Sequence, residues 1–369
     1  MPKAIPSIDL QLRNDPVALK AWIKAEAQDL GFADCVVARP NTEDQIPHLQ
    51  AYLNKGYHAD MHYLAENLDK RANPKLLVEG TACILCVRLN YLQEKPQGRY
   101  VPEQPDIGII ARYARGRDYH KIMRGRLKQL AQRIEAKVGQ FSSRPFSDSA
   151  PIFEKALAEN AGMGWTGKHT LLINRDSGSF FVLGELFCGL PLPFDEPTTA
   201  HCGSCSACID ICPTQAIVAP YQLDARKCIA YLTIEYKGSI PLELRPQIGN
   251  RIFGCDDCQL VCPWNRYAKI TSIDDFLPRH GLDHSSLLEF WQWDEATFFS
   301  KTEGSPIRRT GFQSFKRNVA IALGNASHSK DIIQQLCEQN TVQHQEIVLE
   351  HQHWALQQQL ASEHISKHI

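Results

Sequence analysis

The stretch Cys202-Gly-Ser-Cys205-Ser-Ala-Cys208-Ile-Asp-Ile-Cys212-Pro213 decides how this chain is organised. Its spacing, C-x2-C-x2-C-x3-C-P, is typical of bacterial proteins in which three close thiolates bind one 4Fe–4S cluster and the fourth thiolate binds another. A second set completes both groups, because Cys228 is followed by the run Cys255-Asp-Asp-Cys258-Gln-Leu-Val-Cys262-Pro263. We therefore predict two clusters with crossed ligands: Cys202, Cys205, Cys208 and Cys262 for the first, and Cys212, Cys228, Cys255 and Cys258 for the second.

Two other uses of closely spaced cysteines fit the pattern less well. Disulfides between residues so near in sequence are strained, and nothing in the sequence indicates an oxidising compartment. Structural zinc also uses C-x2-C pairs, but it does not call for further cysteines followed by proline in both runs. The pattern therefore favours a protein that moves electrons.

Composition limits the possible partners. The chain has 369 residues, enough for two or three domains, and a net charge of −1. A neutral chain has no overall attraction to nucleic acid or membrane, so a polyanionic partner must meet a local patch. The N-terminus has no signal peptide pattern, and no stretch is long and apolar enough to span a bilayer. We expect a cytoplasmic protein without a membrane partner. The remaining five cysteines are Cys35, Cys83, Cys86, Cys188 and Cys337. We expect most of them to pack as small hydrophobes.

Alternating strand-like and helical patterns predict a layered α/β or α+β domain over about the first 190 residues. Asp15 and Asp118 are predicted to cap helices that run to Leu30 and Val138. Further helices are expected at 45–54 and 151–161, and strands at 32–38, 82–87, 109–113, 169–174 and 180–187. Helices at 311–323, 330–338 and 342–360 would pack as antiparallel pairs, as in an α-solenoid. The predicted modules are 1–192, 193–270 and 271–369.

Asp148 is a lone carboxylate between Pro145 and Pro151, just before a predicted helix. One interpretation is an N-terminal helix cap. The other is a proton donor at a cofactor face, which requires a pKa raised by burial. The glycines of Gly162-Met-Gly164-Trp-Thr-Gly167 leave a similar choice between a backbone that a large ligand approaches and a plain tight turn.

Basic residues gather in two segments, which either form solvated helix faces or contact phosphates. The first segment holds Arg112, Arg115, Arg117, Lys121, Arg124, Arg126 and Lys128, and the second holds Arg308, Arg309, Lys316 and Arg317.

Together these stretches resemble the epoxyqueuosine reductase family, over nearly the whole chain. The resemblance rests on both cysteine runs and on six further segments: Asp60-Met-His-Tyr-Leu, Arg112-Tyr-Ala-Arg-Gly-Arg-Asp-Tyr-His120, Asp148-Ser-Ala-Pro, Gly164-Trp-Thr-Gly-Lys168, Leu232-Thr-Ile-Glu-Tyr-Lys-Gly238 and Arg309-Thr-Gly-Phe-Gln-Ser-Phe-Lys-Arg-Asn318. It implies an α+β protein made of a nitroreductase-like cobalamin-binding domain, a ferredoxin-like module with two 4Fe–4S clusters, and C-terminal HEAT-like repeats.

The family resemblance also implies roles for single residues. Asp148 would be the catalytic proton donor. Base-off cobalamin would contact Arg71, Ala111, Asp148, Gly167, Lys168, His169, Leu172, Thr233 and Glu235. Some relatives carry cysteine at the position of Ala111, and alanine leaves that face of the cobalt without a side-chain ligand. The tRNA anticodon stem-loop would contact Arg309, Lys316 and Arg317.

The implied reaction reduces epoxyqueuosine to queuosine at the wobble position of tRNA. A donor such as flavodoxin or ferredoxin would feed electrons to a monomeric enzyme, and the cofactor would carry the difficult chemistry. Two rivals remain at this stage. A reductive dehalogenase also pairs cobalamin with two clusters, although the usual twin-arginine signal is absent here. The other rival is a cobalamin-free, ferredoxin-like electron-transfer protein.

Overall fold

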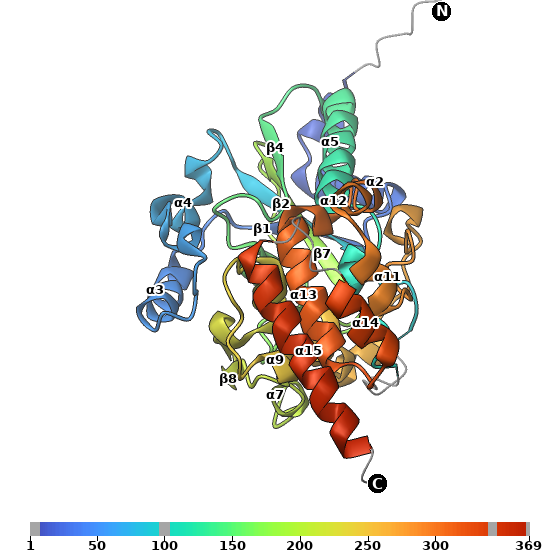
Figure 1. Ribbon diagram of the computed structural model, residues 1–369. Coiled ribbons are helices and arrows are strands. Elements are labelled where there is room, and N and C mark those ends of the chain that lie inside the picture. Colours follow the sequence, from blue (N-terminus) through green and yellow to red (C-terminus); the bar gives the residue numbers. More distant parts are fainter. Residues whose placement is uncertain (1–7, 96–103, 339–344, 367–369) are drawn as a thin grey trace, which may run out of the picture.

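The computed structural model describes residues 8–95, 104–338 and 345–366 (Figure 1). A four-stranded antiparallel sheet has the order β1 (Asp34–Ala38), β2 (Cys83–Asn90), β7 (Phe181–Cys188) and β4 (Ser143–Phe146). Because side chains alternate along a strand, Leu85 and Val87 of β2 face one side and Ile84 and Cys86 the other. Helices cover both faces, which explains why the residues 83–87 of this strand are all apolar.

Helices α2 (Pro16–Asp29) and α5 (Tyr119–Val138) cover one face of the sheet, and α6 (Glu154–Asn160) covers the other. The predicted caps are confirmed, since the Asp15 side chain accepts from the Val17 and Ala18 amides and Asp118 accepts from the His120 amide. Strand β4 was not predicted from the sequence. It is an edge strand of mostly exposed residues that includes a proline, and it lacks the alternation that predicts strands.

The cysteine runs lie in a segment of short elements that packs onto the sheet domain. These elements are α7 (Ala207–Asp210), β8 (Ile217–Ala219), β9 (Gln222–Leu223), α8 (Ile229–Ile234), α9 (Arg245–Ile248), β10 (Arg251–Phe253) and α10 (Asp257–Leu260). Strand β10 pairs in parallel with β3 (Ile109–Ile110), and α7 contacts α10. The segment is therefore joined to the first domain by main-chain hydrogen bonds.

The C-terminal part is helical: α11 (Leu287–Gln292), α12 (Glu295–Lys301), α13 (Phe312–Asn325), α14 (Lys330–Glu338) and α15 (Glu346–Ser366). The two helices α13 and α15 lie side by side (Figure 1), and α13 also packs against β10 and α9. One hydrophobic core continues from Ala225 to Ala355, so the cysteine segment and the C-terminal helices share it. The start of the predicted helix at 342–360 lies outside the described residues.

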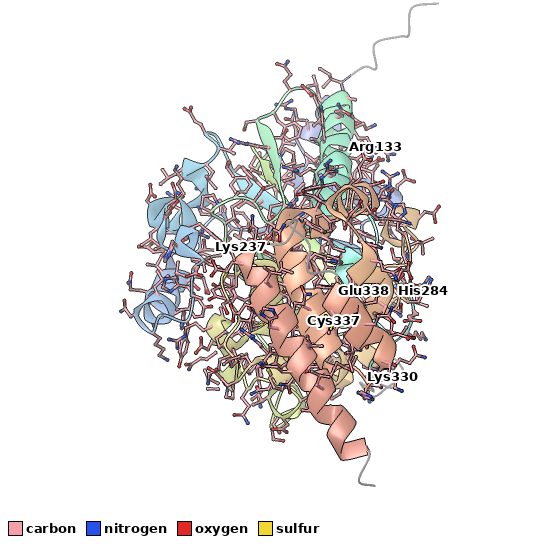
Figure 2. All side chains as sticks on the ribbon, in the orientation of Figure 1. Arg133, Lys237, His284, Lys330, Cys337 and Glu338 are labelled. Atoms are coloured by element: carbon pink, nitrogen blue, oxygen red, sulfur yellow. The ribbon has the colours of Figure 1, made fainter. Side chains whose placement is uncertain are left out.

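The remaining elements are short. They are α1 (Leu10–Arg13), α3 (Ile46–Asn54), α4 (Leu68–Ala72), and the hairpin of β5 (Trp165–Thr166) and β6 (Leu172–Ile173). Of the cysteines outside the two sets, Cys35, Cys83, Cys86 and Cys188 are buried as expected, whereas Cys337 is exposed on α14 (Figure 2). Among the described residues no helix is long and apolar enough to cross a membrane. The mixed helix and sheet content confirms the predicted α+β class.

Candidate active site and cysteine cavity

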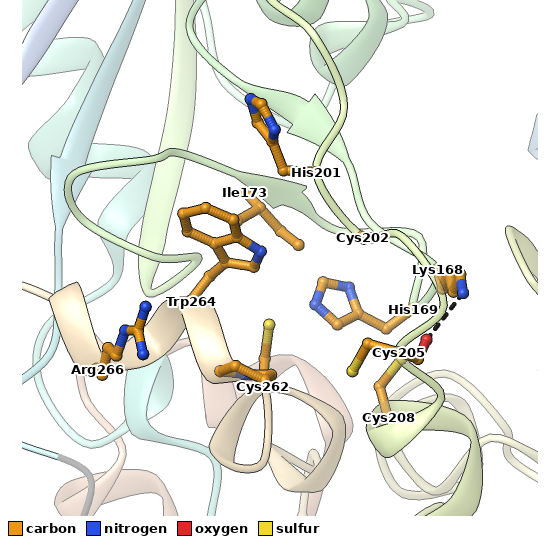
Figure 3. A pocket seen from close by; sticks show the side chains of 11 residues that line it. Lys168, His169, Ile173, His201, Cys202, Cys205, Cys208, Cys262, Trp264 and Arg266 are labelled. Atoms are coloured by element: carbon orange, nitrogen blue, oxygen red, sulfur yellow. Dashed lines mark hydrogen bonds between the residues drawn. The ribbon is translucent and has the colours of Figure 1, made fainter.

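Four cysteines from both runs meet at one cavity. Cys202, Cys205 and Cys208 come from the loop around α7, and Cys262 comes from the end of the second run (Figure 3). The cavity has a volume of about 220 Å³, and all four thiols are free. The last cysteine of the second run thus lies with the first three of the other, which is the crossed arrangement that the spacing predicts. Four free thiols around one space form the donor set of a 4Fe–4S cluster.

The other four cysteines are also free and lie partly buried on neighbouring elements. Burial raises the pKa of the Cys258 thiol, and the nearby Cys228 and Cys208 thiols raise it further. Cys212 accepts a hydrogen bond from the Ala216 amide at 3.2 Å between nitrogen and sulfur. Cys228 immediately precedes α8, and Cys258 lies in α10. The charge of Cys228 acts on Cys258, so these two cysteines lie in the same region.

Lys168 and His169 face the cysteine cavity (Figure 3). The Lys168 ammonium donates to the carbonyl oxygens of Gly203 and Cys205, at 2.7 and 2.8 Å. These bonds hold the loop that carries the first three cysteines. Both residues are predicted to contact cobalamin, and in this structure the Lys168 side chain also supports this loop.

The nearby glycines decide between a ligand surface and close packing of the chain. A side chain at Gly162 would collide with the Glu196 carbonyl, and one at Gly164 with the Ile173 carbonyl. Gly167 lies against the Ile173 and His169 side chains. These glycines permit close approach of this chain to itself, and of the two only Gly162, with a φ of 79°, lies in a turn.

Asp148 lies on the loop between β4 and α6, in the left-handed region with φ of 60°. Its carboxylate accepts hydrogen bonds from the Tyr119 hydroxyl at 3.0 Å and from His120 Nε2 at 3.1 Å. Its side chain is 61% exposed, so a substrate can approach it. The interpretation as a helix cap is wrong, because α6 begins at Glu154 without a side-chain cap.

His120 connects Asp148 to a second carboxylate. Its Nδ1 lies 2.7 Å from Asp118 Oδ1, so the ring bridges two acidic groups and both ring nitrogens donate when it is protonated. Burial lowers the pKa of His120, but the hydrogen bonds to Asp118 and Asp148 outweigh burial and raise the pKa above its ordinary value. The Tyr119 ring stacks on the imidazole at 3.9 Å between centroids. This stack fixes the orientation of the imidazole.

The expectation that burial raises the pKa of Asp148 is wrong. The hydrogen bond from His120 lowers the pKa of this carboxyl more than burial raises it, and the Tyr119 hydroxyl lowers it further. Both shifts favour an ionised Asp148 beside a protonated His120. Sequence reasoning missed this because Asp118 was interpreted as a helix cap and His120 was named only as part of the family segment 112–120.

A carboxyl pair lies beneath the Asp148 loop. Glu154 Oε1 accepts from the Asp148 amide at 2.5 Å and holds the loop in its left-handed conformation. Glu154 faces the fully buried Glu185 of β7, and the two can share a hydrogen bond only when one of them carries a proton. Burial raises the pKa of both groups. Neither glutamate was predicted from the sequence.

The prediction that Lys316 and Arg317 contact tRNA is wrong. Arg317 is fully buried and donates to the carbonyls of Leu232, Tyr236 and Gly238 at 2.7 to 3.0 Å. Lys316 is 1% exposed, donates to the Trp291 carbonyl and lies over the indole of that residue. Both cations therefore join α13 to neighbouring segments and are closed to a phosphate.

Arg309 has a different position from these two. Its side chain is 55% exposed and forms an ion pair with Asp118 at 2.7 Å, beside His120. It therefore belongs to the Asp148 site. Other exposed cations follow His120 or adjoin Arg309 in the sequence, namely Lys121 and Arg124 on α5 and Arg308 in the same turn as Arg309.

The remaining residues predicted to contact cobalamin fall into two groups. Arg71, Ala111, Leu172 and Thr233 are buried, and two of them bind this chain: Arg71 donates to the carbonyls of Tyr63 and Glu66, and the Thr233 hydroxyl donates to the Ile229 carbonyl. Glu235 is exposed, and its charge acts with that of Asp148 on the phenols of Tyr63 and Tyr113. Tyr63 is half exposed, so Tyr63, Glu235 and Asp148 are three exposed side chains, and the charges of the two carboxylates raise the pKa of the Tyr63 phenol.

Two family models match this chain. The one for a 4Fe–4S double cluster binding domain covers residues 201–265, and the one for epoxyqueuosine reductase QueG covers residues 71–149. An epoxyqueuosine reductase from Pseudomonas aeruginosa is 51% identical over 343 residues, which are 93% of this chain and 95% of the relative. The Escherichia coli K12 epoxyqueuosine reductase is 48% identical over 92% of this chain and 89% of its own length.

Solved structures agree with this assignment. A crystal structure of epoxyqueuosine reductase with an epoxyqueuosine-modified tRNA-Tyr stem loop has a TM-score of 0.84 and 27% identity, and the match covers 92% of this chain and 90% of that one. A Bacillus subtilis epoxyqueuosine reductase with the same TM-score and 26% identity has the loop of a catalytic aspartate swung out of the active site, and its match covers 92% of this chain and 90% of that one. This chain belongs to the epoxyqueuosine reductase family.

Proposed function

We propose that this protein reduces epoxyqueuosine in tRNA to queuosine. The observation that carries the proposal is the approachable Asp148 carboxylate, hydrogen-bonded to His120, in the same chain as two sets of free cysteines. Opening an epoxide to an alkene breaks two carbon–oxygen bonds, takes up two electrons and two protons, and releases water. The 4Fe–4S clusters that the two cysteine sets would bind supply single electrons, and the Asp148 site supplies protons.

The proton path begins at His120. When charge develops on the departing oxygen beside Asp148, the imidazolium proton moves from His120 Nε2 to Asp148 Oδ2 and from there to the oxygen. The two groups titrate as one unit, because each shifts the pKa of the other. Asp118 holds the ring at Nδ1, on the side away from Asp148, and Arg309 forms an ion pair with Asp118. Asp148 is the catalytic residue in this scheme, and His120 acts through it.

The proposal includes cobalamin beside the exposed side chains of Tyr63, Glu235 and Asp148. One aromatic and two carboxylate side chains suit a flat macrocycle with amide arms, so the residue types fit this cofactor. When bound, cobalamin supplies a cobalt centre that accepts single electrons at low potential. Arg71 supports the turn of Tyr63, and Ala111 carries no side-chain donor that can bind cobalt.

A tRNA stem-loop is the proposed macromolecular substrate, as in the relative solved with one. Arg308, Arg309, Lys121 and Arg124 are exposed around the Asp148 site and suit contacts to phosphates. They replace Lys316 and Arg317 in this role. The Asp148 loop, with its positive φ, is our candidate for the catalytic loop of the B. subtilis relative.

Several finer features of the proposal follow from the family resemblance. A small electron carrier such as flavodoxin or ferredoxin feeds the clusters of a monomeric enzyme in the cytoplasm. The sheet domain is of the nitroreductase-like type, and α13 to α15 form HEAT-like repeats. The segment boundaries at 192 and 270 mark sequence modules, because one core passes across the second boundary.

Mass spectrometry of tRNA nucleosides tests the function in cells. A strain lacking this gene should accumulate epoxyqueuosine, and the wild-type gene should restore queuosine. An Asp148→Asn gene, expressed to the same level, should not restore it. Normal queuosine in the deletion strain, with no second reductase gene expressed, contradicts the proposal.

A further inference from the structure

His169 is a buried histidine that a tight turn points into the cysteine cavity. Its side chain is 3% exposed. The turn is closed by hydrogen bonds between Gly167 and Leu171 and between Thr170 and Gly167, each 2.8 Å, and Thr170 has a φ of 67°. Gly167 has no side chain to block the ring, since a Cβ there would lie 2.8 Å from His169 Cε1. The local backbone is therefore built around this imidazole.

The main chain also fixes which ring nitrogen carries the proton. The Leu171 amide donates to His169 Nδ1 at 3.1 Å, so Nδ1 presents its lone pair. In the neutral ring the proton is then on Nε2. This Nε2 atom is buried and has no hydrogen-bond partner among the described residues. Buried donors are rarely left in that state, so a partner is expected from a group that fills the cavity.

The cavity identifies the chemistry of that partner. His169 lines it together with Cys202, Cys205, Cys208 and Cys262. Figure 3 shows the ring between the indole of Trp264 and the side chains of Cys205 and Cys262. A cluster bound by the four thiolates presents sulfur atoms as hydrogen-bond acceptors in this space.

We propose that His169 Nε2–H donates a hydrogen bond to a sulfur of the cluster held by Cys202, Cys205, Cys208 and Cys262, and so raises its reduction potential. The inference rests on the proposed ligand set of that cluster. A reduced cluster carries one more negative charge than the oxidised one, so a donor to its sulfur stabilises the reduced form more. Hydrogen bonds to the sulfurs are one of the factors that set cluster potentials.

The test is a redox titration of the full-length protein, reconstituted with iron and sulfide and followed by EPR. The comparison is between wild type and His169→Phe, which keeps a ring and removes the donor. We expect the ratio of reduced to oxidised cluster at a given potential to fall about tenfold, which is about 59 mV for a one-electron couple. Only one of the two clusters should shift. His169→Gln, whose amide can donate, should recover part of the change.

His201→Phe is the matched control. His201 lines the same cavity but is exposed, and its Nε2 has Thr199 as a partner at 3.1 Å. An equal shift in this control overturns the inference, because the effect then reflects cavity polarity. An unchanged potential in His169→Phe with full iron content also overturns it, and it leaves the proposed function intact. If the proposed ligand set is itself wrong, the reconstituted wild-type protein will contain too little iron, and this result is distinct from an unchanged potential.

Pulsed EPR of wild-type protein with 15N-labelled histidine provides a measurement without substitution. The reduced cluster should show a weak coupling to one imidazole nitrogen. Absence of any histidine coupling at a fully reduced cluster overturns the inference even if His169→Phe fails to fold. If His169 contacts the corrin instead, the substitution changes cobalamin affinity and leaves both cluster potentials unchanged.

Discussion

Replacement of His120 by glutamine tests whether the imidazole supplies the Asp148 proton. His120→Gln keeps a neutral donor toward Asp148 but cannot carry a proton across the pair. The change removes charge-assisted hydrogen bonds of 3.1 Å to Asp148 and 2.7 Å to Asp118. A hydrogen bond to a charged group contributes about 1.5–3 kcal/mol. If one such bond is lost at the transition state, single-turnover reduction of epoxyqueuosine-tRNA should slow by about tenfold to about 150-fold.

The pH dependence separates a proton donor from a structural residue. The pKa of His120 is raised in the folded protein, so the imidazolium is present at low pH and lost as pH rises through that raised value. Wild-type turnover should therefore decline on the alkaline side, and this decline should be absent from the already slow His120→Gln enzyme. Saturating reductant is needed so that electron supply does not limit the rate.

The contribution of His120 to the free energy of unfolding should also be larger at low pH than at high pH. A raised native pKa means that the His120 bonds contribute fully below the unfolded value of about 6.5 and are lost as pH rises through the folded value. Urea unfolding should therefore show a larger loss for His120→Gln at pH 5 than at pH 9. A variant with wild-type turnover and an unchanged pH profile refutes the proton role, and equal destabilisation at both pH values refutes the linkage.

Three other predictions follow from the two sites. Asp148→Asn, assayed with full cofactor content, should lower turnover by about a hundredfold or more, because an amide cannot deliver the proton, and retained activity contradicts the catalytic role. Cys262→Ala should reduce iron from about eight to about four per chain, and full iron content contradicts the crossed ligand set. A Lys121/Arg124/Arg308→Ala triple variant should bind tRNA more weakly, with a salt slope flatter by about one unit for each lost phosphate contact. A salt slope equal to that of wild type would mean that tRNA binds at another surface. Substitution of Lys330, an exposed lysine on α14, provides the control.

Sequence reasoning succeeded where the cause of the structure is local. An aspartate before an apolar helix pattern caps it whatever the fold, and both Asp15 and Asp118 do so. The meeting of Cys262 with the first cysteine run was also expected from spacing alone. Asp118 has a second role that no local pattern reveals, since its contacts with His120 and Arg309 depend on chain segments that meet only in the folded protein.

Lys316 and Arg317 were wrongly predicted to contact tRNA because their charges were considered without the apolar residues that surround them in the sequence. Lys316 and Arg317 lie in a helix that is buried on nearly every side, next to Phe315 and a continuous apolar run at 319–323. The five consecutive apolar residues at 319–323 occupy all sides of the helix and place it in a core, and this was the signal that a count of basic residues ignored. A buried guanidinium is tolerated here because carbonyl oxygens surround it.

Residues on either side of these two cations connect the C-terminal helices to the rest of the chain. Arg309 binds Asp118 at the proton site, and the nearby Asn318 side chain donates to the carbonyls of Thr233 and Ile252 at 2.8 and 3.0 Å. One short segment, 309–318, thus contacts both the Asp148 region and the backbone that carries Cys228 and Cys255. Because the bonds to Thr233 and Ile252 are buried, relative movement of these parts breaks hydrogen bonds that water cannot replace. The segment therefore fixes the backbone next to Cys228 and Cys255 relative to the Asp148 site, which the proposed reaction requires because it brings electrons and protons to the same bonds.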